Sequence, residues 1–366
     1  MLAERLKYLK PSGIRKIFDL AETIENSINL SIGMTDFNVP EVIRKEAKLW
    51  MDRGLNQYVN TQGIPELRKE LSENLRREKL KFDDVMITSG VTGGYILSMM
   101  TLVNPGDEVL IPDPRFVMYS FGVELFGGIP RFVDTYPDFK LRPEQIEAMV
   151  TPRTKVLVLN NPNNPTGVVL SPNEVRAIAD VARKHNLYVI ADEIYNKFLY
   201  DNLPYKSIAN FYEKSIVLRG YAKSWGMSGW RIGYVAAASE LIEYFKMLQH
   251  YTYVCAPPFL QKAAMVAENF DGSEIIQHYQ KKRDIVYNGL REFLDVEKPQ
   301  GAFYIFPKVP DGTSTQLVEK AVKRKLLIVP GQAFSEKDTH FRISFAASDE
   351  TLEKGIEILY DLVNER

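Results

Sequence analysis

One lysine in this chain stands in surroundings that can make its amine reactive. Lys223 lies in a stretch, residues 219–234, with four glycines, two tryptophans and three basic residues, a composition unlike that of an ordinary helix or strand. Most lysines are solvated surface residues, and in isolation this one would be read as such. If the aromatic, glycine-rich setting removes water from the amine, its pKa falls and it becomes a nucleophile. Arg231, in the same stretch, offers a planar guanidinium suited to two phosphate oxygens.

Two further polar groups follow predicted strands. Asp192 comes at the end of one strand, just before Glu193, Ile194 and Tyr195. A buried carboxylate there needs a positive partner, such as a protonated heterocyclic nitrogen. The alternative is a solvated acidic turn beside a buried tyrosine. Residues 160–167 hold four asparagines, two prolines and one glycine, and a stiff loop of amide side chains indicates ligand contacts.

A glycine-rich turn, residues 89–94, lies between a predicted strand and a predicted helix. Free N–H groups and the helix dipole make such a turn a natural phosphate cradle. Glycine turns before helices are also common for steric reasons alone. Neither G-x-G-x-x-G nor G-x-x-x-x-G-K-[ST] occurs, which weakens the case for nicotinamide or nucleoside triphosphate binding.

The elements that position these residues alternate between short apolar strands and helices. Strands are predicted at residues 85–88, 108–112, 155–160, 187–191 and 215–218, with helices at 94–102, 142–149 and 172–184 between them. This pattern predicts an α/β fold with a mostly parallel (mixed) sheet between helices. Ligands then bind beyond the carboxyl ends of the strands, where the polar groups occur.

The C-terminal third has a different pattern. Helices are predicted at 275–294, 315–323 and 349–365, and strands at 302–307, 326–329 and 341–345. These elements predict a smaller α+β domain at residues 273–366, after a large domain at 41–272. The N-terminal segment, residues 1–40, shows no sheet pattern of its own and is expected to join the smaller domain.

Composition excludes several other classes of protein. The chain has 366 residues and a formal net charge of -1, so no whole-molecule field favours nucleic acid or an anionic membrane. One cysteine, Cys255, rules out an intramolecular disulfide, and four scattered histidines argue against a metal site. The charged N-terminus does not resemble a signal peptide, and apolar runs are too short to span a bilayer. A cytoplasmic location is expected.

Taken in order, these motifs resemble the class I/II aminotransferases, which are pyridoxal-phosphate (PLP) enzymes of fold type I. The resemblance covers nearly the whole chain and is greatest to the branch of prokaryotic aspartate and aromatic aminotransferases. The motifs that carry it are Asn161-Pro162-Asn163-Asn164-Pro165-Thr166-Gly167, Asp192-Glu193-Ile194-Tyr195, Tyr221-Ala222-Lys223, Gly229-Trp230-Arg231-Ile232-Gly233-Tyr234, Gly63-Ile64-Pro65-Glu66-Leu67-Arg68, Gly301-Ala302-Phe303-Tyr304 and Pro330-Gly331-Gln332-Ala333-Phe334. Residues 31–40, 112–119 and 341–344 fit the family as well.

The resemblance implies a role for each of these residues at the cofactor ring. Lys223 would hold PLP as a Schiff base and then move the proton between the substrate Cα and the cofactor C4′. Asp192 would pair with the pyridinium nitrogen, which makes the ring an electron sink. Tyr195 and Asn164 would bond the ring's 3′ oxygen. Phe116 would stack on the ring, the alternative being a core phenylalanine.

The resemblance also implies how the phosphate is held and predicts a homodimer. The amides of Val91 and Thr92 and the side chain of Arg231 would bind the phosphate, joined by Tyr58 from the partner subunit, so that a dimer shares two sites. Many family members have serines one and three residues before the lysine, where this chain has Ala222 and Gly220. At least one hydroxyl contact is therefore missing, and Ser224, the Thr92 side chain or water could replace it.

For the substrate, the resemblance implies that Arg342 binds the α-carboxylate and that the Gly33 backbone closes over it. A surface salt bridge is the alternative for Arg342. Arg115 is a candidate cation for a second substrate carboxylate, unless it only faces solvent. Met34, Phe37 and Tyr253 are candidates for an apolar pocket that takes an aromatic side chain.

The predicted function is transfer of an amino group from an L-amino acid, aspartate or aromatic, to a 2-oxo acid such as 2-oxoglutarate. Two alternatives stay open. Another fold type I PLP enzyme, such as a C–S β-lyase or other amino acid lyase, would use nearly the same residues. A PLP-binding transcription regulator would need a DNA-binding domain, for which only about 40 residues precede the matched core.

Overall fold

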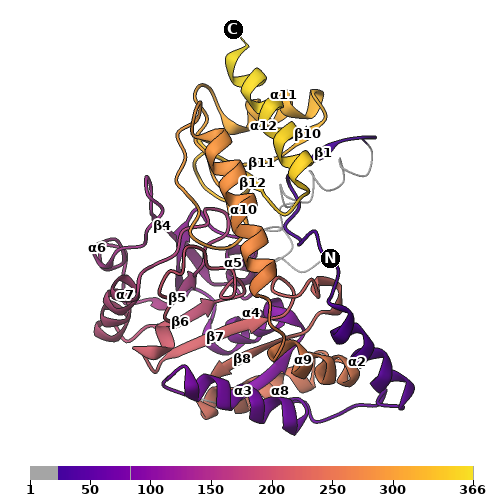
Figure 1. The fold of residues 1–366 in the computed structure, drawn as a ribbon. Coiled ribbons are helices and arrows are strands. Elements are labelled where there is room, and N and C mark those ends of the chain that lie inside the picture. Colours follow the sequence, from indigo (N-terminus) through magenta and orange to yellow (C-terminus); the bar gives the residue numbers. More distant parts are fainter. Residues whose placement is uncertain (1–23, 83, 366) are drawn as a thin grey trace, which may run out of the picture.

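A seven-stranded sheet forms the centre of the computed structural model, which describes residues 24–82 and 84–365 (Figure 1). Its strand order is β2-β8-β7-β6-β5-β3-β4. Only β8 runs antiparallel to its neighbours, β2 and β7, so the sheet is mostly parallel as predicted. The strands are β2 (Asp84–Thr88), β3 (Glu108–Asp113), β4 (Ile129–Asp134), β5 (Thr154–Asn160), β6 (Tyr188–Asp192), β7 (Ser215–Gly220) and β8 (Gly233–Ala237).

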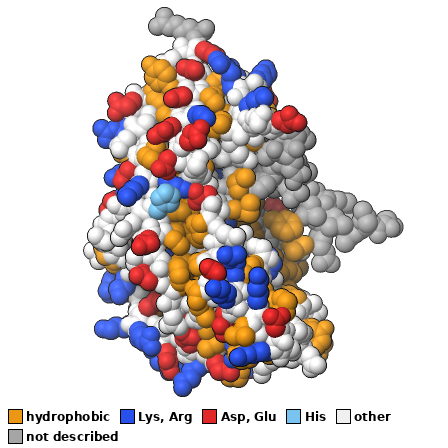
Figure 2. All heavy atoms as spheres, turned by 45° about the vertical axis from the view of Figure 1, so that its right-hand side comes forward, with side chains coloured by type: hydrophobic (Ala, Val, Ile, Leu, Met, Phe, Trp, Pro, Cys, Tyr) orange, Lys and Arg blue, Asp and Glu red, His pale blue; other side chains and the backbone are white. Residues whose placement is uncertain are grey.

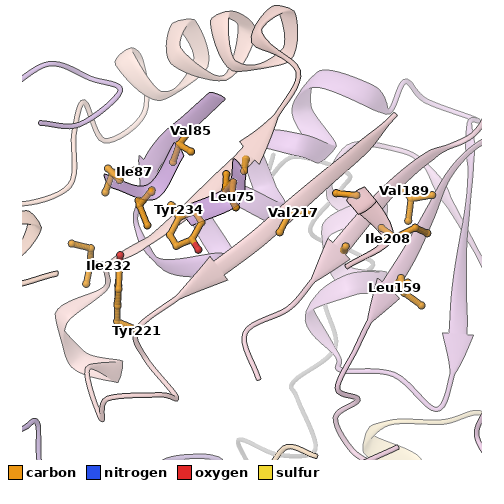
Figure 3. Packing of buried hydrophobic residues seen from close by; sticks show 14 of the residues in the cluster. Leu75, Val85, Ile87, Leu159, Val189, Ile208, Val217, Tyr221, Ile232 and Tyr234 are labelled. Atoms are coloured by element: carbon orange, nitrogen blue, oxygen red, sulfur yellow. The ribbon is translucent and has the colours of Figure 1, made fainter. Parts of the chain in front are cut away.

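The central strands are buried on both faces because helices cover the sheet on both sides. Leu157 and Leu159 of β5 join one apolar cluster, together with residues of the helices α3 (Pro65–Arg77), α7 (Pro172–Lys184) and α9 (Pro258–Glu268). Val156 and Val158 join another, together with residues of α4 (Gly90–Leu102) and α8 (Ser239–His250). Successive side chains of a strand point to opposite faces, so Val, Ile and Leu at every position suit a strand between two layers. Figure 3 shows the first cluster, in which Val85, Val189 and Val217 lie along one face of the sheet.

The helices of this part begin where the sequence supplies start signals. α7 has Ser171 as its cap, Pro172 at its first position and Glu174 returning a bond to the cap, while basic residues occupy its last turn. The helices are α2 (Glu41–Asp52), α3 (Pro65–Arg77), α4 (Gly90–Leu102), α5 (Met118–Leu125), α6 (Pro143–Glu147), α7 (Pro172–Lys184), α8 (Ser239–His250) and α9 (Pro258–Glu268).

Among the described residues, the C-terminal part carries two small sheets and three α-helices. Its elements are α10 (Ser273–Leu290), β9 (Tyr304–Ile305), α11 (Ser314–Lys323), β10 (Leu326–Leu327), β11 (Val329–Pro330), β12 (Phe341–Ser344) and α12 (Asp349–Asn364). β12 pairs with both β11 and β9 in antiparallel fashion. Figure 1 shows α10 and α12 side by side above the large sheet.

The N-terminal segment contributes a strand to this part that the sequence did not predict. β1 (Ile28–Asn29) pairs in parallel with β10, and the Ser344 amide donates to the Leu30 carbonyl at 2.8 Å. Residues 1–23 of the segment lie outside the described residues.

Several predicted elements differ from those observed. The predicted strand 326–329 is two strands, β10 and β11, that belong to different sheets, and the predicted strand 302–307 shortens to β9. The predicted helix 142–149 shortens to α6, and β4 and β8 were missed.

Among the described residues, no helix has both the length and the apolar content needed to cross a membrane. Acidic and basic side chains are interspersed on the face shown in Figure 2.

Candidate active site

Eight of the residues selected from the sequence line a single cavity of about 140 Å³. They are Val91, Thr92, Phe116, Asn164, Asp192, Tyr195, Lys223 and Arg231. The cavity lies beyond the carboxyl ends of β5 and β6, whose last residues, Asn160 and Asp192, are in its wall. This is the place where an open α/β sheet binds ligands.

Lys223 enters the cavity from the loop after β7. Burial, together with the nearby cations Arg342 and Arg231, lowers the pKa of its amine to about 8, and Asp192 opposes this shift. The Nζ atom donates to the Gly33 carbonyl at 2.5 Å. A lysine that loses its proton this readily can act as a nucleophile and as a base near neutral pH.

Asp192 is 3% exposed at the end of β6. Burial raises the pKa of its carboxyl to about 6, although hydrogen bonds from the Tyr119 hydroxyl and the Ile194 amide favour the charged form. The Tyr119 hydroxyl donates to Oδ2 at 2.8 Å. A positive group in the cavity would therefore pair with a carboxylate that is almost fully shielded from water. Sequence reasoning missed the role of Tyr119, although the residue lies in a stretch that fits the family.

The next residue, Glu193, lies on the opposite face of the sheet. Arg219 donates from Nε to Glu193 at 2.9 Å and binds Glu78 through both terminal nitrogens. Ser224 and Gly220 line a second cavity on that side, together with Arg219. Ser224, one of the proposed replacements for the missing serine contact, thus does not line the cavity that holds Lys223.

The start of α4 and the Arg231 side chain meet at one corner of the first cavity. A Cβ on Gly90 would lie 2.9 Å from the Arg231 guanidinium, and the φ of 65° at this position favours glycine. Ser228 and Thr92 line the same cavity, and no hydrogen bond of either side chain is found among the described residues. The sequence did not single out Ser228.

The glycine found in place of a serine at position 220 has a structural reason. A Cβ there would meet the Gly233 Cα at 3.1 Å, and a Cβ on Gly233 would meet the Val91 nitrogen at 3.0 Å. The two glycines face each other across β7 and β8. They bring the start of β8 directly behind the first turn of α4.

Arg342 lies beside the cavity on β12 and is 1% exposed. It donates to the Asn164 side-chain oxygen at 3.1 Å and to the Ser31 carbonyl at 2.7 Å, and its Nε is buried without a partner among the described residues. The Tyr304 ring lies 4.4 Å from the guanidinium carbon, and its hydroxyl is 3.0 Å from that of Tyr195. The surface salt bridge considered for Arg342 is therefore wrong.

Two other sequence candidates are positioned differently from the cavity residues. Tyr58 is 83% exposed and lies outside the cavity in the single chain. Arg115 bonds Asp113 and Glu336, each at 2.7 Å, and is 12% exposed, so its charge is already balanced. Phe116 lines the cavity, with its ring centroid 6.0 Å from that of Tyr119.

Comparison with known proteins places the chain in a family. The family model described as aminotransferase class I and II matches residues 25–359. A probable aspartate aminotransferase of Methanocaldococcus jannaschii is 36% identical, with 99% of this chain and all of the relative covered. Aromatic-amino-acid aminotransferase 2 of Thermococcus litoralis is 38% identical, over 100% of this chain and 99% of its own length.

A solved structure agrees with these relatives. The aromatic aminotransferase from Pyrococcus horikoshii superposes with a TM-score of 0.90 at 36% identity, covering 96% of this chain and 99% of that one. These comparisons do not favour a lyase or a regulator. The chain belongs to the class I and II aminotransferases and is an enzyme of the transferase class.

Proposed function

We propose that the protein is a PLP-dependent aminotransferase in which Lys223 anchors the cofactor. The observation that carries the proposal is one cavity that combines an amine of lowered pKa, a buried carboxylate and an arginine beside the first turn of a helix. PLP matches this set, because it has an aldehyde, a basic ring nitrogen and a phosphate. When bound, PLP supplies an electron sink for the charge that develops at the substrate Cα.

The residues that line the cavity match the ring nitrogen, the 3′ oxygen and the phosphate of PLP. Asp192 would keep a proton on the ring nitrogen, and Phe116 would lie against the ring. Tyr195 and Asn164 would hydrogen-bond the ring's 3′ oxygen. The amides of Val91 and Thr92, the Arg231 guanidinium and, in place of the missing serines, the Ser228 hydroxyl would hold the phosphate. The observation that most directly supports this phosphate site is the close approach of the Arg231 side chain to Gly90, at the start of α4.

The substrate's α-carboxylate is bound by Arg342. Its Nε is buried and unpartnered among the described residues, and a carboxylate would satisfy it together with a terminal nitrogen. The Gly33 backbone lies against Lys223 and closes over the substrate. The Lys223 amine would take the proton from the substrate Cα onto Nζ and give it back to Cα when the reaction runs in the reverse direction.

We also propose a cytoplasmic homodimer with shared sites. Tyr244, Met247 and Tyr251 follow helical spacing on α8 and its C-cap and are 48%, 52% and 86% exposed, an apolar face of the kind that partners cover. Tyr58, also exposed, would reach the partner's phosphate. The large domain (41–272) would hold the cofactor, and the small domain (273–366, with 1–40) would supply Arg342.

We propose aspartate or an aromatic amino acid as donor and a 2-oxo acid such as 2-oxoglutarate as acceptor. The names of the relatives, one a probable aspartate and one an aromatic enzyme, support both donors. The ion pairs of Arg115 with Asp113 and Glu336 favour the aromatic donor, since this arginine has no free charge for a second carboxylate.

A donor panel without acceptor tests the proposal. Purified holoenzyme mixed with each amino acid should release one equivalent of the matching 2-oxo acid per site and then stop, until an acceptor restarts it. Continuous product release without acceptor would indicate a lyase. Absence of any product with every donor would contradict aminotransferase activity.

A further inference from the structure

Residues 31–37, which we call the covering segment, contact two cations of the proposed site, Lys223 and Arg342, through their backbone. The Gly33 carbonyl accepts from Lys223 Nζ at 2.5 Å, and the Ser31 carbonyl accepts from Arg342 at 2.7 Å. A Cβ at Gly33 would lie 2.8 Å from the Tyr304 hydroxyl, so the segment also packs tightly against the cavity wall. The position of this backbone therefore affects the two groups that meet the substrate.

Asp36 ties the covering segment to α10. Its Oδ1 accepts from the Tyr279 hydroxyl at 2.6 Å, its amide donates to the same hydroxyl at 3.2 Å, and its Oδ2 forms an ion pair with Lys282 Nζ. Tyr279 is fully buried and Lys282 is 1% exposed, whereas the Asp36 side chain is 26% exposed. The two residues of α10 are thus buried, and they bind Asp36 at the edge of the covering segment.

The burial of Lys282 makes this contact specific. A buried ammonium group needs a paired carboxylate, and Asp36 is the only acidic side chain found paired with it among the described residues. The neighbouring Phe37 ring meets the Tyr279 ring edge-on at 6.0 Å. The Phe37 carbonyl lies 3.0 Å from the position that a Cβ on Gly226 would occupy, and Gly226 follows Lys223 by three residues.

We propose that Asp36, Tyr279 and Lys282 form a latch that holds the covering segment over Lys223 and so sets the affinity for the amino acid substrate. The inference rests on the proposed function, since it concerns the same site. The three latch residues are positioning residues, because they act through the backbone of Gly33 and Ser31. None of the three lines the cavity that holds Lys223.

The latch predicts a particular kinetic signature. If its loss leaves the closed segment populated in only a fraction of molecules, the apparent substrate affinity falls by that fraction. A closed population of about one tenth would raise KM about tenfold. The cofactor should be retained, since Asp192, Arg231 and the start of α4 do not depend on the segment.

The test uses holoenzyme variants. Asp36→Asn breaks the ion pair but leaves Lys282 buried and unpaired. The double variant Asp36→Ala/Lys282→Met removes both charges and the acceptor of the Tyr279 bond, and so controls for misfolding. Tyr279→Phe removes only the hydroxyl. Lys281→Met, which changes an exposed lysine on the same helix, is the matched control.

Steady-state KM and kcat are measured for the best donor, with PLP retention after dialysis as the second readout. We expect KM to rise about tenfold in the double variant with PLP retention unchanged, a smaller rise in Tyr279→Phe and none in Lys281→Met. An unchanged KM in a folded, PLP-loaded double variant would overturn the latch but leave the proposed function intact. Equal loss of kcat and PLP would show a structural role and also overturn it. A wild-type protein that transaminates no donor would instead contradict the proposed function.

Discussion

Replacing Tyr119 with phenylalanine removes a single hydroxyl that donates to the Asp192 carboxylate at 2.8 Å. Such a bond to a charged group contributes about 1.5–3 kcal/mol, and one pKa unit corresponds to about 1.4 kcal/mol. Because the bond favours the charged form, its loss raises the pKa of Asp192. Starting from a pKa of about 6, the variant should reach a value of about 7 to 8.

The consequence is a pH-dependent loss of cofactor affinity. The apo-protein of the variant can protonate Asp192, and that proton must leave before the carboxylate meets the charged ring nitrogen. At pH 7 this competition weakens PLP binding by about twofold to tenfold relative to wild type, and near pH 9 the difference largely vanishes. Equilibrium titration of both apo-proteins with PLP at the two pH values measures the ratio.

Tyr95→Phe is the matched control. Tyr95 is also fully buried, and its hydroxyl donates to the Tyr119 carbonyl at 2.7 Å and not to Asp192. Tyr95→Phe should give the same ratio of PLP affinity to wild type at both pH values. If Tyr119→Phe weakens binding equally at both pH values, or if Tyr95→Phe reproduces its pH dependence, the reasoning about Asp192 is refuted.

Three other predictions test other parts of the site. The pKa of Lys223, about 8 against 10.5 for an ordinary lysine, means that the folded apo-protein binds fewer protons than the unfolded chain between these pH values, so stability rises with pH there. Lys223→Met should flatten that rise in urea unfolding; an unchanged slope would contradict the lowered pKa. Arg342→Lys should raise KM for every donor by roughly tenfold to a hundredfold, because it loses a two-point contact, whereas Arg115→Met should leave KM for aspartate within about twofold; a large effect of Arg115→Met would show that this arginine meets the substrate. Ser228→Ala should weaken binding of PLP several-fold but not of pyridoxal, which lacks the phosphate, and Ser224→Ala should change neither; equal weakening of both ligands would remove Ser228 from the phosphate corner.

The sequence predicted the central strands well because their burial leaves a local signature. β5, β6 and β7 are Val-, Ile- and Leu-rich on both faces, a pattern that requires no knowledge of their partners. β4 begins with an exposed Ile129 and contains Pro130, as an edge strand can, and so shows no continuous apolar run. β8 starts at Gly233, at the end of the glycine- and tryptophan-rich stretch, where composition hides its strand character.

The sequence identifies those candidate site residues whose own neighbours in the chain are unusual. Lys223 and Asp192 stand in unusual local surroundings and could be selected directly. Tyr119 lies 73 positions from Asp192, and Lys282 lies 246 positions from Asp36, so only the fold brings these pairs together. Likewise, both Ser224 and Ser228 follow Lys223 closely, and only the path of the loop decides which one faces its cavity.

Attachment of the cofactor to Lys223 is the central claim, and peptide mapping tests it most directly. Holoenzyme is reduced with borohydride to make the cofactor bond permanent, then digested and examined by mass spectrometry. The cofactor mass should appear on the peptide that contains Lys223, on no other lysine, and should be absent from Lys223→Ala treated in the same way. A label on a different lysine, or one that persists in Lys223→Ala, would contradict the account.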